Sequence, residues 1–243
     1  MSYFKINKID AIDSTNLALK RKYHKSLMKH GEVLWALDQV KGKGQRASQW
    51  VSEPNKNLTF SIFLSQDKLL LDSVFVLNCW VALAVKNALT SFGVPCVSIK
   101  WPNDILSENK KICGLLIENL YRGKKLEASI VGIGLNVNQI NFGELNRASS
   151  MRLCSGRAFN LEEVLQQILT QLAHILERKL SVAASFKAYN KALFGVGEQR
   201  TFLEDGKAFL ATVEEVNQQG DLVLKAADNE RRFFQHKTIE WVY

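Results

Sequence analysis

The sequence predicts an α/β (α+β) protein in which helices and strands mix up to about residue 193 and short strands follow. Two long segments, 72–92 and 161–180, repeat apolar residues with the period of a helix. Residues 57–65 alternate apolar and polar side chains, which is the pattern of a strand with one face on a core. After residue 197 the chain carries short alternating stretches separated by glycine-containing turns, a pattern typical of a small β-barrel.

The first predicted elements are a strand, a helix and a second strand. Residues 3–9 alternate and predict a short strand. Residues 13–16, Asp-Ser-Thr-Asn, offer N-cap side chains for a helix that we expect to run to about His30 and to stop at Gly31. Residues 32–37 predict a short apolar strand, which leads into a loop rich in glycine and lysine.

The longest apolar helix is predicted over residues 72–92. Asp72 is its expected N-cap, and Gly93 ends it. Residues 97–101 then predict a strand that Pro102 interrupts, because proline has no N–H to donate to a neighbouring strand.

The second half of the chain begins with a predicted hairpin. Residues 111–121 and 126–137 are two strongly apolar strands with a Gly-Lys-Lys turn between them. Periodicity fades over residues 139–160, which predict a long loop, and returns as two helices over 161–180 and 181–193.

A domain boundary is predicted at residues 194–197, where Phe-Gly-Val-Gly follows the last helix. We therefore expect one domain over residues 1–193 and a small β-barrel domain over 194–243.

The composition is that of an ordinary globular chain. Of 243 residues, 47% are apolar and 23% are charged. The N-terminus has no secretory signal pattern, no uninterrupted apolar run is long enough to span a bilayer, and the four cysteines form no Cys-x-x-Cys pair. We expect a cytoplasmic protein with reduced thiols and no membrane role. The four histidines show no spacing of a metal site or a triad, and the sequence identifies no metal ligand.

The net charge of +8 raises a nucleic-acid interpretation. The basic residues are scattered, however, and no predicted helix carries a dense basic stripe. A solvated, mildly basic surface therefore explains the charge better than a nucleic-acid site does.

A loop rich in glycine and lysine follows the predicted strand over residues 32–37. Gly42 and Gly44 let the backbone turn so that its N–H groups face an anion, and Lys43 and Arg46 add positive charge. The loop does not match a Walker or dinucleotide-binding pattern. On its own, the segment is more typical of a plain surface loop than of an anion site.

Three further segments follow in a fixed order. They are Lys-Trp-Pro-Asn-Asp at 100–104, Lys-x-x-Gly-x-x-x-Glu at 111–118 and Gly-x-Gly-x-Asn-x-Asn at 132–138. A carboxylate at Asp104 can orient an attacking amine. A glycine at position 114 lets a ligand approach the strand backbone, within reach of Lys111.

Together and in this order, the four segments resemble the catalytic domain of biotin–protein ligases. The resemblance implies a mixed sheet backed by helices, followed by a small barrel. It implies that ATP and Mg²⁺ are used to convert biotin to biotinyl-5′-AMP, and that biotin is then transferred to a lysine of a biotin carboxyl carrier protein. The division at residue 193 then separates a biotin- and ATP-binding catalytic domain from the barrel.

The resemblance also assigns roles to residues of this chain. Lys111, Arg46 and Asp104 match the catalytic positions. The positions matching biotin contacts are Ser14, Thr15, Asn16, Gln39, Lys43, Gly44, Gln45, Lys111 and Gly114. The positions matching ATP contacts are Arg46, Trp50, Asn103, Gly134 and Asn136. The offset to Gly114 favours Lys111 over neighbouring Lys110 as the functional lysine.

The basic loop departs from the family pattern. Lys43 and Gln45 stand where the family has arginines, and Ala47 replaces a frequent glycine. Lysine is a point charge without the planar two-pronged contact of arginine, and glutamine removes a charge. Arg46 is then the main guanidinium expected at a phosphate.

Two alternatives stay open at this stage. A lipoate–protein ligase would share the fold and the adenylate chemistry, although its arginine-rich, triple-glycine signature is absent. A basic nucleic-acid-binding protein is the alternative from another class. Because the chain begins at the catalytic domain, without the winged helix of some family members, we expect no DNA-binding role. A homodimer is compatible with the resemblance.

Overall fold

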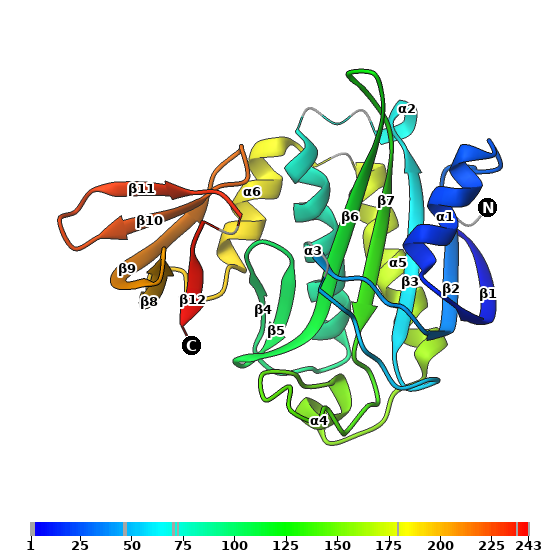
Figure 1. The fold of residues 1–243 in the computed structure, drawn as a ribbon, viewed down its shortest axis with the longest axis horizontal. Coiled ribbons are helices and arrows are strands. Elements are labelled where there is room, and N and C mark those ends of the chain that lie inside the picture. Colours follow the sequence, from blue (N-terminus) through cyan, green and yellow to red (C-terminus); the bar gives the residue numbers. More distant parts are fainter. Residues whose placement is uncertain are drawn as a thin grey trace.

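A seven-stranded mixed sheet forms the centre of the molecule, with helices on both faces and a second, five-stranded sheet at one end (Figure 1). The computed structural model describes residues 3–45, 48–69, 71, 73–178, 180–236 and 238–242.

The large sheet has the strand order β1-β2-β3-β7-β6-β5-β4. The first two strands are parallel, and every other neighbouring pair is antiparallel. The predicted hairpin is confirmed as β6 and β7, the longest strands of the sheet. The strands are β1 (Lys5–Ile12), β2 (Glu32–Gln39), β3 (Leu58–Ser65), β4 (Val97–Lys100), β5 (Asp104–Ser107), β6 (Lys110–Arg122) and β7 (Lys125–Leu135).

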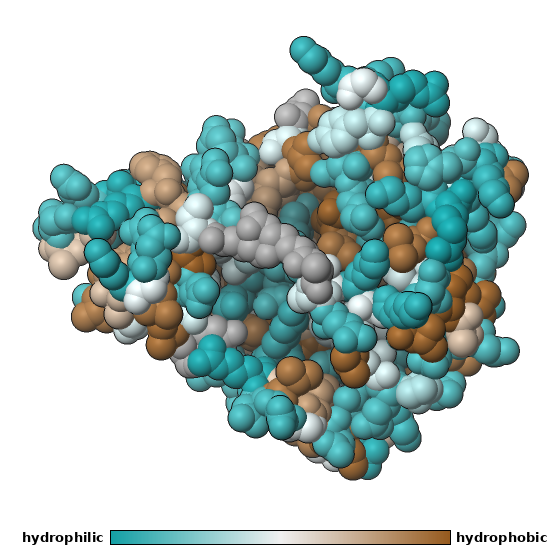
Figure 2. Space-filling model, in the orientation of Figure 1, coloured by the Kyte–Doolittle hydropathy of each residue, from teal (hydrophilic) through white to brown (hydrophobic). Residues whose placement is uncertain are grey.

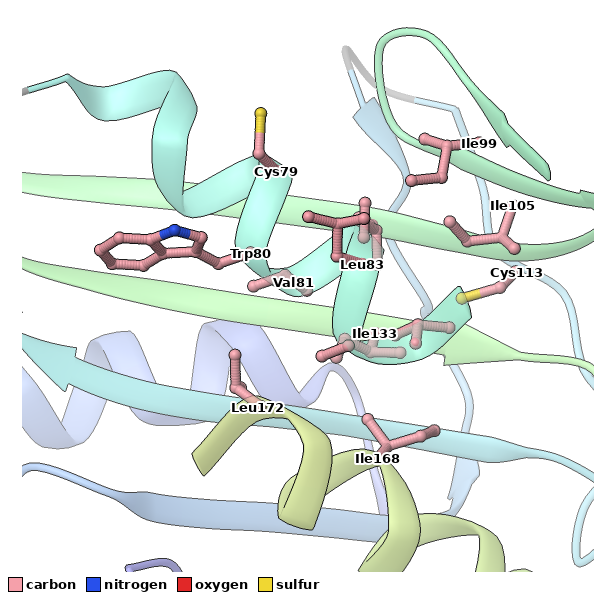
Figure 3. Close-up of a cluster of buried hydrophobic side chains, with 14 of the residues drawn as sticks. Cys79, Trp80, Val81, Leu83, Ile99, Ile105, Cys113, Ile133, Ile168 and Leu172 are labelled. Carbon is pink, nitrogen blue, oxygen red and sulfur yellow. The ribbon is translucent and has the colours of Figure 1, made fainter. Parts of the chain in front are cut away.

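The main core lies between this sheet and two long helices. Val81 and Leu83 of α3 share one buried cluster with Ile133 of the sheet and with Ile168 and Leu172 of α5 (Figure 3). By length and composition alone α3 could cross a membrane, but it is mostly buried in this core, as soluble proteins require of such a helix. The helices are α1 (Thr15–His24), α2 (Gln66–Leu69), α3 (Val74–Ser91), α4 (Met151–Ser155), α5 (Leu161–Arg178) and α6 (Val182–Lys191).

The opposite face of the sheet is covered by α1 along one part of each central strand and is open along the next part. On β7, Val131 and Ile133 point into the main core, while Ile130 packs under α1 in a second, smaller cluster. On that same second face, the next two alternate positions are Gly132 and Gly134. Since successive side chains of a strand alternate between faces, the glycines leave an open strip of sheet beyond the end of α1.

Strand β3 is buried on both faces, whereas the alternation predicted burial of one. Seven of its eight residues are buried. Phe63 packs under α1, and Thr59 and Ser61 lie on the same face at the open strip. The polar residues that the sequence pattern assigned to solvent are therefore buried by α1 and its surroundings.

Helix α1 is six residues shorter than predicted. It ends at His24, and Ser26 adopts a left-handed backbone with φ of 56°. Leu27 is largely exposed, so a longer helix would bury no further apolar face against the protein. Packing of such a face is what stabilises most helices in proteins. The chain instead turns His30 toward the sheet, where its ring lies 3.1 Å from the backbone nitrogen of Ser65.

Three short elements were not predicted. Residues 66–69 form α2, and residues 151–155 form α4 inside the expected long loop. Asp104–Ser107 form β5, which turns back on β4 after a cis Trp101–Pro102 bond. Each is too short to show a period in the sequence.

The five strands after residue 197 are confirmed as strands and form an antiparallel sheet in the order β11-β10-β9-β8-β12. The predicted small barrel thus takes the form of a sheet whose two edges are β11 and β12. Its strands are β8 (Gln199–Glu204), β9 (Lys207–Val216), β10 (Leu222–Ala226), β11 (Arg231–Phe234) and β12 (Glu240–Val242).

The turn between β9 and β10 joins this sheet to the rest of the molecule. The indole nitrogen of Trp101 donates to the carbonyl oxygen of Gly220 at 2.8 Å. The side chain of Asn190 in α6 bonds both backbone groups of Val216, at 2.8 and 3.1 Å. Gly220 has a φ of +91°, and a Cβ there would lie 2.7 Å from the ring of Phe75.

We predict that Gly220→Ala destabilises the protein more than Gly206→Ala. Both glycines have positive φ, but a Cβ on Gly206 would meet nothing within 4 Å, so alanine there costs only the left-handed backbone, about 1 kcal/mol. At Gly220 the contact with Phe75 adds about 1–3 kcal/mol of overpacking. Urea unfolding of both variants measures the difference. Equal losses would mean that Phe75 moves aside freely.

Candidate active site

The open strip of the large sheet is built from small residues in register. Thr59 of β3 is paired with Gly134 of β7, Gly134 with Gly114 of β6, and Gly114 with Asp104 of β5. One row therefore crosses four strands and ends at a carboxylate. This face of the molecule is hollowed near its centre, between the C-terminal sheet and α1 (Figure 2).

The glycine pair makes room for an indole ring. A Cβ on Gly134 would lie 2.5 Å from Cε2 of Trp50, and one on Gly114 would lie 3.1 Å from its Cζ3. Trp50 therefore rests directly on the backbone of β6 and β7. Side chains at these two positions would lift the ring off the sheet.

A second row of paired residues lies two positions from the first on each strand, and the N-terminus of α1 packs on it. Ser61 of β3 is paired with Gly132 of β7, and Gly132 with Leu116 of β6. A Cβ on Gly132 would overlap Oδ1 of Asn16, the second residue of α1. Glycine here lets the N-terminus of α1 bring polar atoms onto the sheet.

The glycine-lysine loop folds back on itself above the strip. The backbone nitrogen of Trp50 donates to the carbonyl of Gly42 at 3.0 Å, and that of Gly44 donates to Ser48 at 2.7 Å. A Cβ on Gly42 would overlap the carbonyl oxygen of Trp50. The loop thus forms a small hairpin that delivers Trp50 to the glycine pair. Arg46 lies outside the described residues.

A β-bulge turns Lys111 toward the site. Ile105 is paired with Cys113, but the next residue, Leu106, is paired with Lys111, so Ile112 is an extra residue in β6. Ile112 and Cys113 both point into the main core. Lys111 is thereby placed on the glycine face, as bulges commonly re-aim a side chain.

Lys111 and Asp104 form an ion pair at the end of the first row. The Nζ atom lies 2.7 Å from Oδ1 of Asp104 and 5.6 Å from the centre of the Trp50 ring. The lysine side chain is about one-third exposed, at 35%, and the carboxylate is 17% exposed. The ammonium group can therefore be reached by a ligand that lies on Gly114.

Polar side chains at the N-terminus of α1 form a hydrogen-bonded chain. Oε1 of Gln39 accepts from the backbone nitrogen of Thr15 at 2.9 Å and from its hydroxyl at 3.0 Å. The Ser61 hydroxyl lies 2.7 Å from Oγ1 of Thr15 and 2.6 Å from Oδ1 of Asn16. Burial of these groups makes their hydrogen bonds costly to disrupt.

These groups line a first cavity of about 190 Å³. Arg46 is outside the described residues, and Asn136 lies on a neighbouring cavity. The other residues singled out from the sequence line the first one: Ser14, Thr15, Asn16, Gln39, Lys43, Gly44, Gln45, Trp50, Asn103, Asp104, Lys111, Gly114 and Gly134.

A second cavity, about 460 Å³, adjoins the first and shares Trp50 and Lys111 with it. Its lining is largely apolar, with Val51, Phe142 and Leu145. The wall carrying these last two residues is tied to β6, because the backbone nitrogen of Lys111 donates to Arg147 and its carbonyl oxygen accepts from Ser149.

Asn136 supplies a buried polar atom at this second cavity. Its Nδ2 donates to the carbonyl of Ser149 at 2.9 Å, while Oδ1 has no hydrogen-bond partner among the described residues. A buried oxygen without a partner costs free energy unless a ligand or water supplies a donor. Asn103, by contrast, donates a hydrogen bond from its side-chain amide nitrogen to the carbonyl oxygen of Leu115, at 2.7 Å.

Sequence patterns missed part of the lining. His236, before β12, reaches the first cavity and meets Trp101 edge-on at 5.9 Å between ring centres. The sequence analysis assigned no site role to the four histidines, since nothing near residue 236 marks a site. The other missed residues are Ser48, Gln49, Thr59, Phe60, Leu115, Leu116 and Ile133.

Two titratable groups near the site have shifted pKa values. Burial raises the pKa of the Cys113 thiol, which faces the core behind Gly114, so this cysteine stays neutral. Hydrogen bonds from Arg21 hold the pKa of Asp13 below its usual range. Among the described residues, no group of three or more His, Cys, Asp or Glu side chains is placed to hold a metal ion.

We predict that Gly134→Ala releases the glycine-lysine loop. The added methyl group would lie 2.5 Å from the body of the Trp50 indole, so the ring must leave the sheet and the loop loses its anchor. Tryptic cleavage after Lys41 and Lys43 should become on the order of tenfold faster. Gly123→Ala, in the open turn of the β6–β7 hairpin, is the control. Unchanged cleavage at the loop would show that Trp50 does not hold it.

Comparison with known proteins places these features in a family. The sequence profile described as "Biotin/lipoate A/B protein ligase family" matches residues 9–136, more than half of the chain. The bifunctional ligase/repressor BirA of Bacillus spizizenii is 32% identical over 143 residues, which cover 57% of this chain and 44% of the relative. The biotin–[acetyl-CoA-carboxylase] ligase of Paracoccus denitrificans is 35% identical over 110 residues, 42% of this chain and 44% of the relative.

The fold agrees over nearly the whole chain. The biotin protein ligase of Aquifex aeolicus, solved in complex with biotin and ATP, superposes with a TM-score of 0.82 at 24% identity, covering 98% of this chain and 99% of that one. This likeness confirms the predicted fold class. The chain spans less than half the length of the BirA relative. On the extent of the sequence match, this chain belongs to the biotin/lipoate A/B protein ligase family.

Proposed function

We propose that this protein is a biotin–protein ligase. It condenses biotin with ATP to biotinyl-5′-AMP and pyrophosphate, and transfers biotin to a lysine of a biotin carboxyl carrier protein. One observation carries the proposal: a polar cavity and an apolar cavity meet at Lys111, which is paired with Asp104 of the polar cavity. A reaction that joins two different substrates needs two such pockets with a charged group where they meet.

The first cavity suits the ureido ring of biotin. A ureido group carries two N–H donors and one carbonyl acceptor. Thr15 and Asn16 offer oxygen atoms at the end of the cavity, and the buried Ser61 hydroxyl lies behind them. The first turn of a helix such as α1 presents backbone N–H groups without partners inside the helix, which suit the carbonyl.

The second cavity suits adenine. Its apolar lining fits a flat heteroaromatic base, and the unpartnered Oδ1 of Asn136 can accept from the exocyclic amino group. Trp50 lines both cavities, so the indole can cover the nucleotide once both substrates are bound.

Lys111 acts in the first step. A biotin carboxylate oxygen attacks the α-phosphorus, and the bond to pyrophosphate breaks, with the electron pair leaving on the pyrophosphate oxygen. Negative charge gathers on the carboxylate and phosphate oxygens, beside the Nζ atom of Lys111. A fixed cation there stabilises the transition state more than the separated substrates. We assign Arg46 and Lys43 to the same phosphates.

Asp104 acts in the second step. The amine of the carrier lysine attacks the acyl carbon, and the bond to AMP breaks with the electron pair leaving on the phosphate oxygen. The attacking amine must lose a proton. Asp104, at the end of the glycine row, is placed to orient that amine and to accept the proton.

Mg²⁺ enters, in this proposal, with ATP as part of the substrate. Among the described residues that line the first cavity, Asp104 is the one carboxylate, and it is already paired with Lys111. That donor set does not fit a resident magnesium site, since Mg²⁺ in protein sites is usually held by carboxylates together with substrate phosphates.

The proposal extends to domain roles and location. Residues 1–193 carry the chemistry, and residues 194–243 form an accessory unit that brings His236 to the cavity wall. Four free cysteines are consistent with a reducing cytoplasm. The proposal also allows the protein to form a homodimer.

The alternatives have less support. The dithiolane ring of lipoate has no N–H group to donate to the oxygen atoms of Thr15 and Asn16. A nucleic-acid role is motivated only by the net charge of +8, and the basic residues do not gather on one helix.

We predict that the protein binds biotin, that ATP strengthens the binding, and that lipoate binds at least tenfold more weakly. The reason is the polar end of the first cavity and the loop that can close over both substrates. Calorimetry with each ligand, and mass spectrometry of a carrier domain incubated with biotin and ATP, measure this. Equal affinity for lipoate, or an unmodified carrier, would refute the biotin assignment.

Lys111→Ala is predicted to slow formation of the adenylate a hundredfold or more, because loss of one preorganised charge typically costs about 3 kcal/mol in the transition state. Lys110→Ala is the matched control, since Lys110 is exposed and lines neither cavity. Single-turnover release of pyrophosphate gives both rates. A wild-type rate in Lys111→Ala would remove this lysine from the reaction and leave the charge to Arg46.

A further inference from the structure

Glu118 closes the Lys-x-x-Gly-x-x-x-Glu segment but does not line either cavity. It lies on β6, two residues beyond Leu116, and faces α1. Its Oε2 accepts from Nδ2 of Asn16 at 2.9 Å, and its Oε1 lies 3.7 Å from Nζ of Lys20, one helical turn further on. About one-third of the Glu118 side chain is exposed.

The carboxylate and the backbone carbonyl of Leu116 together set which way the Asn16 amide points. An ionised carboxylate can only accept hydrogen bonds, so the nitrogen of the amide must face Glu118. The same nitrogen also donates to the carbonyl of Leu116 at 3.2 Å. Both side-chain N–H groups of Asn16 therefore donate to residues of β6, and Oδ1 points to Ser61 and Gly132.

The orientation of Asn16 leaves a surplus acceptor at the cavity. Ser61 has one hydroxyl proton but lies within hydrogen-bond distance of two oxygens, those of Thr15 and Asn16. The Thr15 hydroxyl gives its own proton to Gln39. Whichever oxygen Ser61 serves, the other keeps a lone pair for an outside donor.

We propose that Glu118 is a positioning residue that sets the specificity of the first cavity. By holding Asn16 with its oxygen inward, it keeps this end of the cavity an acceptor and selects ligands whose ring carries N–H donors. The inference rests on the proposed function, in which that ring is the ureido ring of biotin. Without the carboxylate, the Leu116 carbonyl alone holds the amide nitrogen on β6, so the Asn16 amide turns over more readily and presents a donor, which opposes an N–H group.

Binding of three ligands by Glu118→Ala tests the proposal. The ligands are biotin, a biotin analogue with a ring oxygen in place of one N–H, and ATP. We expect the Kd for biotin to rise about tenfold, the upper range for the net contribution of one neutral hydrogen bond. The Kd for the oxygen analogue should rise less, so that discrimination between the two falls. The Kd for ATP should stay within about twofold, since Glu118 does not touch the second cavity.

Lys20→Ala is the matched control for charge. It removes the ion pair of Glu118 but leaves the hydrogen bond to Asn16, so discrimination should be retained. Glu118→Gln should show an intermediate loss, because a glutamine can present either its oxygen or its nitrogen to Asn16.

A reversed pair provides a rescue. Asn16→Asp alone puts two carboxylates at hydrogen-bond distance and should weaken biotin binding. Adding Glu118→Gln lets the new amide at position 118 donate to the new carboxylate at position 16. The other oxygen of that carboxylate still faces the cavity, so most of the affinity for biotin should be recovered. The double-mutant cycle isolates this coupling. A purely structural role of Glu118 would instead weaken ATP and biotin binding together and give no recovery in the reversed pair.

The outcomes separate the two proposals. Failure of the wild-type protein to bind biotin would overturn the proposed function. Biotin binding by the wild type with unchanged discrimination in Glu118→Ala would overturn the role of Glu118 alone.

Discussion

The absence of side chains at Gly114, Gly132 and Gly134 is the constraint on which the rest of the site depends. These three positions face away from the main core, on strands whose other face packs against α3 and α5. The space they leave is filled by Trp50 and Asn16, each closer to the backbone than any Cβ would permit. The sheet therefore supplies a floor, and the loop and the N-terminus of α1 supply walls.

Chemistry in this site comes from placement more than from reactive groups. One ion pair, Lys111 with Asp104, has its lysine where the polar and apolar cavities meet. Its position depends on the bulge at Ile112, which turns the lysine out of the core. Fixed charges that need no rearrangement during reaction are the most effective electrostatic catalysts. Glu118 extends the same logic to recognition, since it acts only by fixing the orientation of Asn16.

Local patterns predicted the elements that bury long, regular faces. The β6–β7 hairpin, α3 and α5 are within a few residues of expectation because each repeats its pattern over many residues. The pairing of Gly114 with Gly134, the approach of Ser61 to Asn16 and the arrival of His236 depend on tertiary contacts, which no local period encodes. The family resemblance supplied most of the site residues, but not the second row of small residues that receives α1.

The most direct test is a crystal structure with a non-hydrolysable analogue of biotinyl-5′-AMP. We expect the ureido ring against Thr15 and Asn16, the adenine against Asn136, and the linking phosphate within hydrogen-bond distance of Lys111. The analogue should lie across Gly114 and Gly134 in the place that the Trp50 ring fills here, with Trp50 moved off the sheet to cover it. An adenine bound outside the cavity of Asn136, or a phosphate remote from Lys111, would contradict this arrangement.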